Sequence, residues 1–132
     1  MSLNIRVIAP DRLIWDTTAE SVVLPSLTGQ LGILTGHAPL ITSLEIGILR
    51  RKVNSNWVPI VVLGGFAVIQ NDSVLVLISG VEEVIKEDYD KAKEILAKAK
   101  KNLDSAKTTK EIIDASQELK IASAKVKAFK FL

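Results

Sequence analysis

The hydrophobic period of the chain changes once, near residue 86, and this change limits the folds open to it. Before that point apolar residues come in short runs separated by turn signals such as Pro10, Gly29 and Asn71. This pattern predicts an all-β sandwich or barrel. After Gly80 there is neither proline nor glycine, and apolar residues recur every three or four positions, which is the period of an amphipathic helix.

Two helices are predicted in the second region. The first apolar stripe consists of Ala92, Leu96, Ala99, Leu103 and Ala106. The second consists of Ile112, Ala115, Leu119, Ala122, Val126 and Phe129. Between them, Thr108 followed by Glu111 is a capping-box signal, so the second helix should start there. Because alanine buries little apolar area, we expect a lightly packed hairpin that can open without unfolding the β region.

The predicted fold class is therefore α+β by domain. We expect an antiparallel β-sandwich over residues 1–84 and an antiparallel two-helix hairpin over residues 85–132. Residues 21–44 carry no charge and are long enough to cross a bilayer. Proline and glycine interrupt them repeatedly, so we interpret them as buried strands and turns. No apolar block opens the chain, and we expect neither a signal peptide nor a transmembrane segment.

Composition excludes several classes of site. The chain of 132 residues has no cysteine and one histidine, which excludes a disulfide scaffold, a thiolate zinc site and a histidine-rich metal site. Catalysis by His37 would need a nucleophile and an orienting acid, and its surroundings offer no such pattern. The run of Arg50, Arg51 and Lys52 lacks interleaved aromatics, so we interpret it as a solvated edge or a partner-facing patch. We expect no catalytic residue, metal, cofactor or nucleic-acid partner.

Four motifs follow one another in the β region. They are residues 29–34 (GQLGIL), 37–40 (HAPL), 46–50 (IGILR) and 64–67 (GGFA). Together with residues 3–5 (LNI), residues 10–16 (PDRLIWD) and the helical hairpin, they make the chain resemble the epsilon subunit of F-type ATP synthases, in its plastid and cyanobacterial branch. The resemblance covers the whole length.

This resemblance implies a non-catalytic subunit of the central rotor stalk with a β-sandwich and a C-terminal helix pair. Such a subunit couples proton-driven rotation to ATP synthesis, and its helices restrain ATP hydrolysis. The implied partners are the gamma subunit, the c-ring and the alpha/beta head. The implied location is peripheral, on the stromal side of the chloroplast thylakoid membrane, or on the cytoplasmic side in a cyanobacterium. The alternative is a free-standing β-sandwich binding module whose hairpin dimerises it.

The resemblance also assigns contacts with the stalk and the ring. A gamma contact is implied for His37, Ala38 and Pro39. A turn histidine bonded to backbone is an equally good and compatible interpretation of His37. The glycines at 29 and 32 predict a tight hairpin loop, and the resemblance implies that Thr28, Gly29 and Gln30 rest on the c-ring. Because Gln30 is neutral, it cannot form the ion pair that acidic residues offer in bacterial relatives.

The last helix has a basic end, with no acidic residue after Leu119. This charge suits the helix dipole in any protein. The resemblance implies that the hairpin can open. The last helix would then meet an acidic loop of the catalytic beta subunits through Lys120, Lys125 and Lys127.

Some bacterial relatives bind ATP through a motif of Ile-Asp-x-x-Arg-Ala type at the start of the first helix. Asp88 and Ala92 match that motif here, but Glu87 replaces the aliphatic residue and Lys91 replaces the arginine. The extra carboxylates of Glu87 and Asp90 would repel a triphosphate, and lysine lacks the planar fork of arginine. We therefore predict weak or no ATP binding by Asp88 and Lys91.

Overall fold

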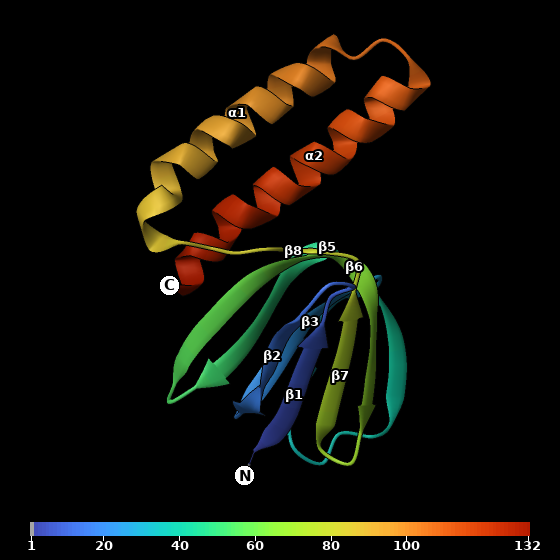
Figure 1. Ribbon diagram of the computed structural model, residues 1–132, viewed down its shortest axis with the longest axis vertical. Helices are drawn as coiled ribbons and strands as arrows, with labels where there is room; N and C mark the ends of the chain where they lie inside the picture. The colour runs from blue at the N-terminus through green and yellow to red at the C-terminus, as the bar shows by residue number, and fades with distance from the viewer. Residues whose placement is uncertain (1) are drawn as a thin grey trace.

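The computed structural model describes residues 2–132 as a β-sandwich with a helical hairpin against one end (Figure 1). The strands are β1 (Leu3–Ile8), β2 (Leu13–Ala19), β3 (Ser21–Ser26), β4 (Gly29–Ile33), β5 (Leu40–Val53), β6 (Asn56–Gln70), β7 (Ser73–Ile78) and β8 (Val81–Glu82). The helices are α1 (Tyr89–Ser105) and α2 (Thr109–Ala128), with short 3-10 turns η1 (Lys86–Asp88) and η2 (Phe129–Phe131). The predicted fold class is confirmed.

Both layers of the sandwich belong to one continuous sheet. The strand order is β2-β1-β7-β6-β5-β3-β4, with β8 beside β6. Because β5 and β6 are 14 and 15 residues long, they curve from one layer into the other (Figure 1). All pairings are antiparallel except that of β1 with β7. The alternation within each strand does not specify its partner, so this parallel pair could not be predicted.

The core follows the predicted alternation. In β1, the side chains of Leu3, Ile5 and Val7 are fully buried, whereas the intervening Asn4 and Arg6 are exposed. Their buried neighbours come from both layers and include Leu24, Ile33, Leu49, Ile69, Val74 and Val76. Period-two burial of this kind stabilises the sheet through its inner face and leaves the outer face free for other contacts.

Gly64 and Gly65 lie inside an uninterrupted β6. The sequence predicts either a bulge or a close approach of two backbones at this point, and the structure shows the close approach. The ladder with β5 keeps its register on both sides, from Ile46 opposite Leu63 to Leu44 opposite Gly65. A Cβ atom on Gly65 would overlap the carbonyl oxygen of Leu77. The φ angle of Gly65, 138°, also lies in the region that favours glycine.

The tight loop predicted over residues 29–32 is displaced. The turn falls at Leu27 and Thr28, and β4 begins at Gly29, whose φ of 122° closes the turn. Gly32 lies within β4 opposite Val23. The pattern of two glycines therefore located the hairpin correctly but not its tip, since only the first glycine has a positive φ angle.

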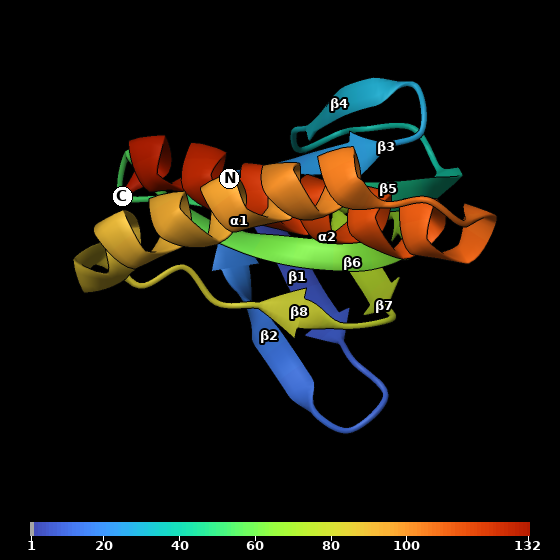
Figure 2. The ribbon, with the colours of Figure 1, turned by 90° about the horizontal axis from the view of Figure 1, so that it is seen from above.

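The helices form the expected antiparallel hairpin, and α2 lies between α1 and the sheet (Figures 1 and 2). Buried alanines line the helix–helix seam, as predicted: Ala92 and Ala99 from α1, and Ala115 and Ala122 from α2. The sequence did not indicate a second buried face of α2. There, Ala124 and Ala128 pack around Val61, with Ile48, Leu63 and Val84 at the edge.

The capping box at the start of α2 is confirmed and depends on the charge of Glu111. The N–H of Glu111 donates to Thr108 Oγ1 at 3.1 Å. Its carboxylate accepts from the backbone N–H groups of Lys107 at 2.9 Å and Thr108 at 3.3 Å. These hydrogen bonds, with Lys107 contributing most, lower the pKa of Glu111 below its ordinary value of 4.5.

We expect the first turn of α2 to fray in acid. Because the pKa of Glu111 is lower in the folded state, its contribution is fully present above the unfolded-state pKa and is lost as pH falls through the folded-state value. Amide exchange and chemical shifts over residues 109–112 should therefore change below about pH 4. A Glu111→Gln variant is the control, because it carries no titrating group. An identical acid transition in that variant would contradict the assignment.

Candidate functional site

The outer face of the sheet carries a continuous apolar surface. Cross-strand partners share one face, so the strand registers place two rows of side chains side by side. One row runs from Ile41 to Val68 and Leu75. The other runs from Phe66 to Leu77 and Ile8, and ends at Leu13. We name this surface the outer apolar face, formed by Ile8, Leu13, Ile41, Phe66, Val68, Leu75 and Leu77.

Several of these side chains are strongly exposed. Ile41 is 73% exposed, Leu13 50% and Phe66 45%. The remaining members are half-buried by their neighbours. A monomeric protein seldom leaves so many neighbouring large apolar groups in water, and contiguous patches of this kind mark interaction surfaces. The hairpin does not cover this surface, because α2 packs on the halves of β5 and β6 near Ile48 and Val61.

The loop that contains His37 lies beside the outer apolar face. His37 is half-buried, and its Nδ1 donates a hydrogen bond to Ala38 O at 2.6 Å, which matches the turn-histidine interpretation. The N–H of Gly36 donates to Asp72 Oδ1 at 2.7 Å and thereby ties the loop to the β6–β7 turn. Ala38 and Pro39 are exposed and lead directly into β5. The structure therefore places the predicted gamma-contact residues at one edge of the outer apolar face.

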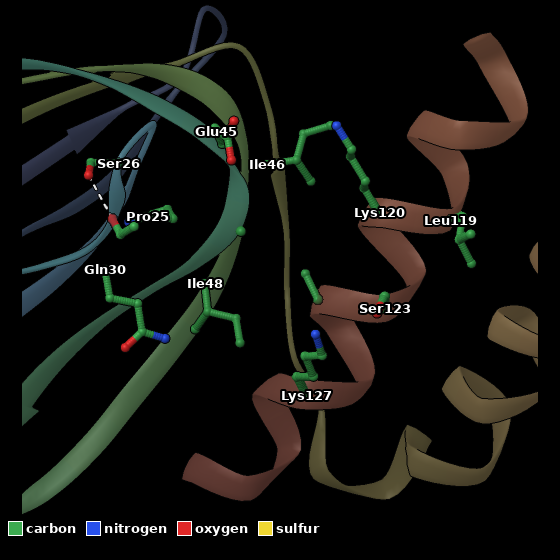
Figure 3. Close-up of a pocket in the computed structure, with 13 residues that line it drawn as sticks. Pro25, Ser26, Gln30, Glu45, Ile46, Ile48, Leu119, Lys120, Ser123 and Lys127 are labelled. Carbon is green, nitrogen blue, oxygen red and sulfur yellow. Dashed lines mark hydrogen bonds between the residues drawn. The ribbon is translucent and has the colours of Figure 1, made fainter.

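A second surface lies on the other layer, between the β3–β4 hairpin and α2. Thr28, Gly29 and Gln30 are all exposed at this hairpin. Ser26 fixes its shape, since Ser26 Oγ donates to Gly29 O at 2.6 Å and lies 3.2 Å from Thr28 Oγ1. An open groove of about 450 Å³ separates the hairpin from α2 (Figure 3).

The groove brings together residues that the sequence assigned to different partners. Gly29 and Gln30 line its strand side, and Lys120 and Lys127 line its helix side. Figure 3 shows Lys120 extending from α2 toward the strand that carries Ile46. Within residues 2–132 neither lysine forms an ion pair. Lys125 lies elsewhere and pairs with Glu82 of β8, with Nζ 3.7 Å from Oε2.

The basic run on β5 is not a solvated edge, which contradicts the first of the two interpretations offered for it and leaves the partner-facing patch as a prediction. Arg50, Arg51 and Lys52 are half-buried. The guanidinium carbon of Arg50 lies 4.2 Å from the ring centroids of both Trp57 and Phe131. That of Arg51 lies 4.7 Å from the centroid of Trp15. Trp15 and Phe131, which cover the two arginines, are distant from them in sequence, so sequence periodicity alone could not reveal these contacts.

Burial lowers the pKa of both Arg50 and Arg51 below the ordinary value. Guanidinium groups nevertheless remain charged at neutral pH. Nε of Arg51 is buried without a hydrogen-bond partner in the described structure. The two arginines therefore contribute mainly through stacking on aromatic rings, which suits the weak hydration of a guanidinium group.

Asp88 and Lys91, which match the ATP-binding motif in position, belong neither to the outer apolar face nor to the groove beside α2. Asp88 is half-buried in η1, and Lys91 is exposed on the first turn of α1. Neither of them lines the groove beside Lys120. Among the described residues there is no cluster of three or more acidic or histidine side chains that could hold a metal ion. In residues 2–132, no helix combines the length and apolarity that crossing a bilayer demands.

Comparison with known proteins decides the family. The profile of the ATP synthase Delta/Epsilon chain β-sandwich domain matches residues 2–84. The profile of the Delta/Epsilon chain long α-helix domain matches residues 88–130. The chain belongs to the ATP synthase delta/epsilon chain family. The resemblance stated from the sequence motifs is thus confirmed.

Relatives within this delta/epsilon family include plastid proteins. The chain is 89% identical, over 132 residues and the full length of both chains, to the chloroplastic ATP synthase epsilon chain of Pylaiella littoralis. It is 51% identical to that of Pyropia yezoensis over 128 residues, which are 97% of this chain and 96% of the relative. These high identities over whole chains support the plastid branch.

Solved structures show the same fold at much lower identity. A chain in the mitochondrial ATP synthase of Euglena gracilis has a TM-score of 0.80 at 20% identity, covering 96% of this chain and 80% of the other. A chain in the central stalk and c-ring structure from Tetrahymena thermophila has a TM-score of 0.63 at 13% identity, covering 98% and 97%. The sandwich and hairpin of the delta/epsilon family are therefore common to distant ATP synthases.

Proposed function

We propose that this chain is a non-catalytic subunit of the central stalk of a chloroplast ATP synthase. It links the proton-driven c-ring to the gamma subunit and restrains ATP hydrolysis through its hairpin. Family membership supports this proposal, together with the names of relatives such as the chloroplastic epsilon chain of Pylaiella littoralis. The location that follows is peripheral, on the stromal side of the thylakoid membrane.

The observation that carries the proposal is the outer apolar face. A surface of this size needs a partner, and a stalk subunit has one in gamma. His37, Ala38 and Pro39 extend this contact at its edge, where the hydrogen bond from Gly36 to Asp72 holds their loop in place. We therefore assign gamma to the outer apolar face and its adjoining loop.

The β3–β4 hairpin supplies the proposed contact with the c-ring. Thr28, Gly29 and Gln30 are exposed, uncharged and held by Ser26, as suits a contact with polar loops. Two separate surfaces for gamma and the ring let one rigid sandwich transmit rotation between them. In this proposal residues 1–84 are the anchor domain, and residues 85–132 are the regulatory domain.

The proposed inhibitory contact uses Lys120, Lys125 and Lys127 once the hairpin leaves the sandwich. In the docked hairpin Lys125 is already paired with Glu82, so opening must break that ion pair first. A dimerising hairpin is less well supported, because one apolar side of α2 packs on α1 and the other on Val61. We also propose that ATP binds weakly or not at all at Asp88 and Lys91.

Adding the chain back to a synthase head that lacks it but contains gamma tests this function. We expect the full chain to inhibit ATP hydrolysis, and a chain truncated after Glu87 to bind the head without inhibiting it. Both proteins should compete for one site, which a displacement assay with labelled full chain would measure. If neither protein binds, the proposed function is wrong. If both inhibit equally, the assignment of inhibition to the lysines of α2 is wrong.

A further inference from the structure

The last helical turn, η2, is held against the sandwich by an aromatic contact. Arg50 of β5 lies between two rings, with its guanidinium carbon 4.2 Å from the centroid of Trp57 and 4.2 Å from that of Phe131. The two rings also meet edge to face, with centroids 6.4 Å apart and an interplanar angle of 70°. A cation between two aromatic rings is stabilised by both of their negative faces.

Elsewhere in the contact between hairpin and sandwich, the buried side chains that the hairpin contributes are small. The buried centre of this contact consists of Ala124 and Ala128 around Val61, and alanine side chains bury little area. The ion pair of Lys125 with Glu82 has a distance of 3.7 Å and partners that are 26% and 43% exposed, so water screens it. Phe131 is therefore the large side chain of the last turn that reaches across to the sandwich.

Contacts within the hairpin hold Phe131 in position. The ring of Phe129, two residues earlier, contacts that of Tyr89 at the start of α1, with centroids 5.1 Å apart and an interplanar angle of 58°. This pair fixes η2 relative to both helices. Lys130 Nζ lies 5.0 Å from the Phe131 ring, so a second cation accompanies the ring without pairing with an acid among the described residues. These contacts couple the insertion of Phe131 to the docking of the hairpin.

We propose that Arg50 and Trp57 form a binding site for an aromatic side chain, that its ligand in this chain is Phe131, and that occupancy of this site keeps the hairpin docked. When the hairpin opens, the site empties and exposes Arg50 and Trp57, because these two side chains contact Phe131. A ligand that binds one of two states shifts the equilibrium by its differential affinity, and here the ligand is part of the chain itself. The binding site itself does not depend on the proposed function. Only its effect on the restraint of ATP hydrolysis rests on that function.

Distance measurements on the isolated full chain test this site. The chain has no native cysteine, so Gln70→Cys and Lys101→Cys, both at exposed positions, give unique spin-label sites on the sandwich and on α1. We expect one narrow distance distribution for the parent chain. Phe131→Ala should raise the ratio of undocked to docked chains about tenfold, seen as a second, broad component.

Further variants near the C-terminus distinguish the effect of an aromatic ring from the effect of side-chain size. Phe131→Tyr should keep the hairpin docked, whereas Phe131→Leu should open it, because leucine is apolar but has no aromatic face. Leu132→Ala is the matched control and should leave the distribution unchanged. Arg50→Gln should open the hairpin as Phe131→Ala does, and the double variant should open it no further, because both changes remove one contact.

Several results would overturn the inference. They are an unchanged distribution in Phe131→Ala, equal opening in Leu132→Ala, additive effects of Arg50→Gln and Phe131→Ala, and a parent chain that is already undocked. The sample contains no gamma, ring or head, so these results do not depend on the proposed function. Conversely, a chain that shows the expected distances but fails to bind the synthase head would overturn the proposed function alone.

Discussion

A Gly65→Ala variant should lose about 3 kcal/mol or more of the free energy of unfolding, because the new methyl group has no room and the backbone resists alanine. The added Cβ would overlap Leu77 O and lie 2.8 Å from Ile78 Cα, both of which belong to the backbone of β7. A backbone cannot move aside as a flexible side chain can. The φ of 138° adds strain of its own. Urea unfolding, followed by tryptophan fluorescence, measures the loss.

Gly32→Ala is the matched control for this prediction. Gly32 also lies in a strand, but no atom comes within 4 Å of the position that an added Cβ would occupy, and its φ is not positive. We expect a change within about 0.5 kcal/mol, as for other surface substitutions. Equal destabilisation by the two variants would show that the loss comes from glycine removal in general. In that case the close approach of β6 to β7 would not be the cause.

A charge within the outer apolar face should abolish tight binding to gamma. Phe66→Asp places a carboxylate where the proposed interface excludes water, and burial of an unpaired charge is strongly unfavourable. We expect at least about a 100-fold loss of affinity, equivalent to about 3 kcal/mol. Titration of the variant against a gamma-containing head, at constant salt, measures the change. Ile41→Asp should act in the same direction.

Ile113→Asp provides the control, since Ile113 is 54% exposed on α2 and far in sequence from the outer apolar face. It should bind gamma with the parental affinity. Thermal unfolding of all three variants checks that the strand substitutions leave the sandwich folded. If Phe66→Asp folds and still binds gamma normally, the outer apolar face is not the gamma site.

Local signals in the sequence predicted the elements well. The alternation of Leu3, Ile5 and Val7 specified which face of β1 is buried, and the pairing of Thr108 with Glu111 located the start of α2. Both signals act over a few residues, where backbone geometry alone relates side chains to one another. The alanine seam of the hairpin was predicted for the same reason.

Contacts between distant segments were not predictable in this way. More than half of the chain separates Arg50 from Phe131, and no local pattern indicates that the two side chains meet. The outer apolar face could not be predicted either, for the same reason. Its members Ile41, Phe66 and Leu77 become neighbours only through the registers of β5, β6 and β7. Sequence analysis assigned residues 21–44, which include Ile41, to buried strands and turns, because an apolar run does not show which of its side chains face outward.

The parallel pairing of β1 with β7 has a consequence for how the chain assembles. β1 is synthesised before the other strands of the sandwich, yet one of its two neighbours, β7, begins only at Ser73. Until then β2 is its only partner, and the apolar inner side of Leu3, Ile5 and Val7 remains in water. Closing so long a loop is entropically costly, whereas the β5–β6 hairpin forms from adjacent segments. We therefore expect the nascent chain to nucleate at β5–β6 and to need protection of its N-terminal strand until β7 is made.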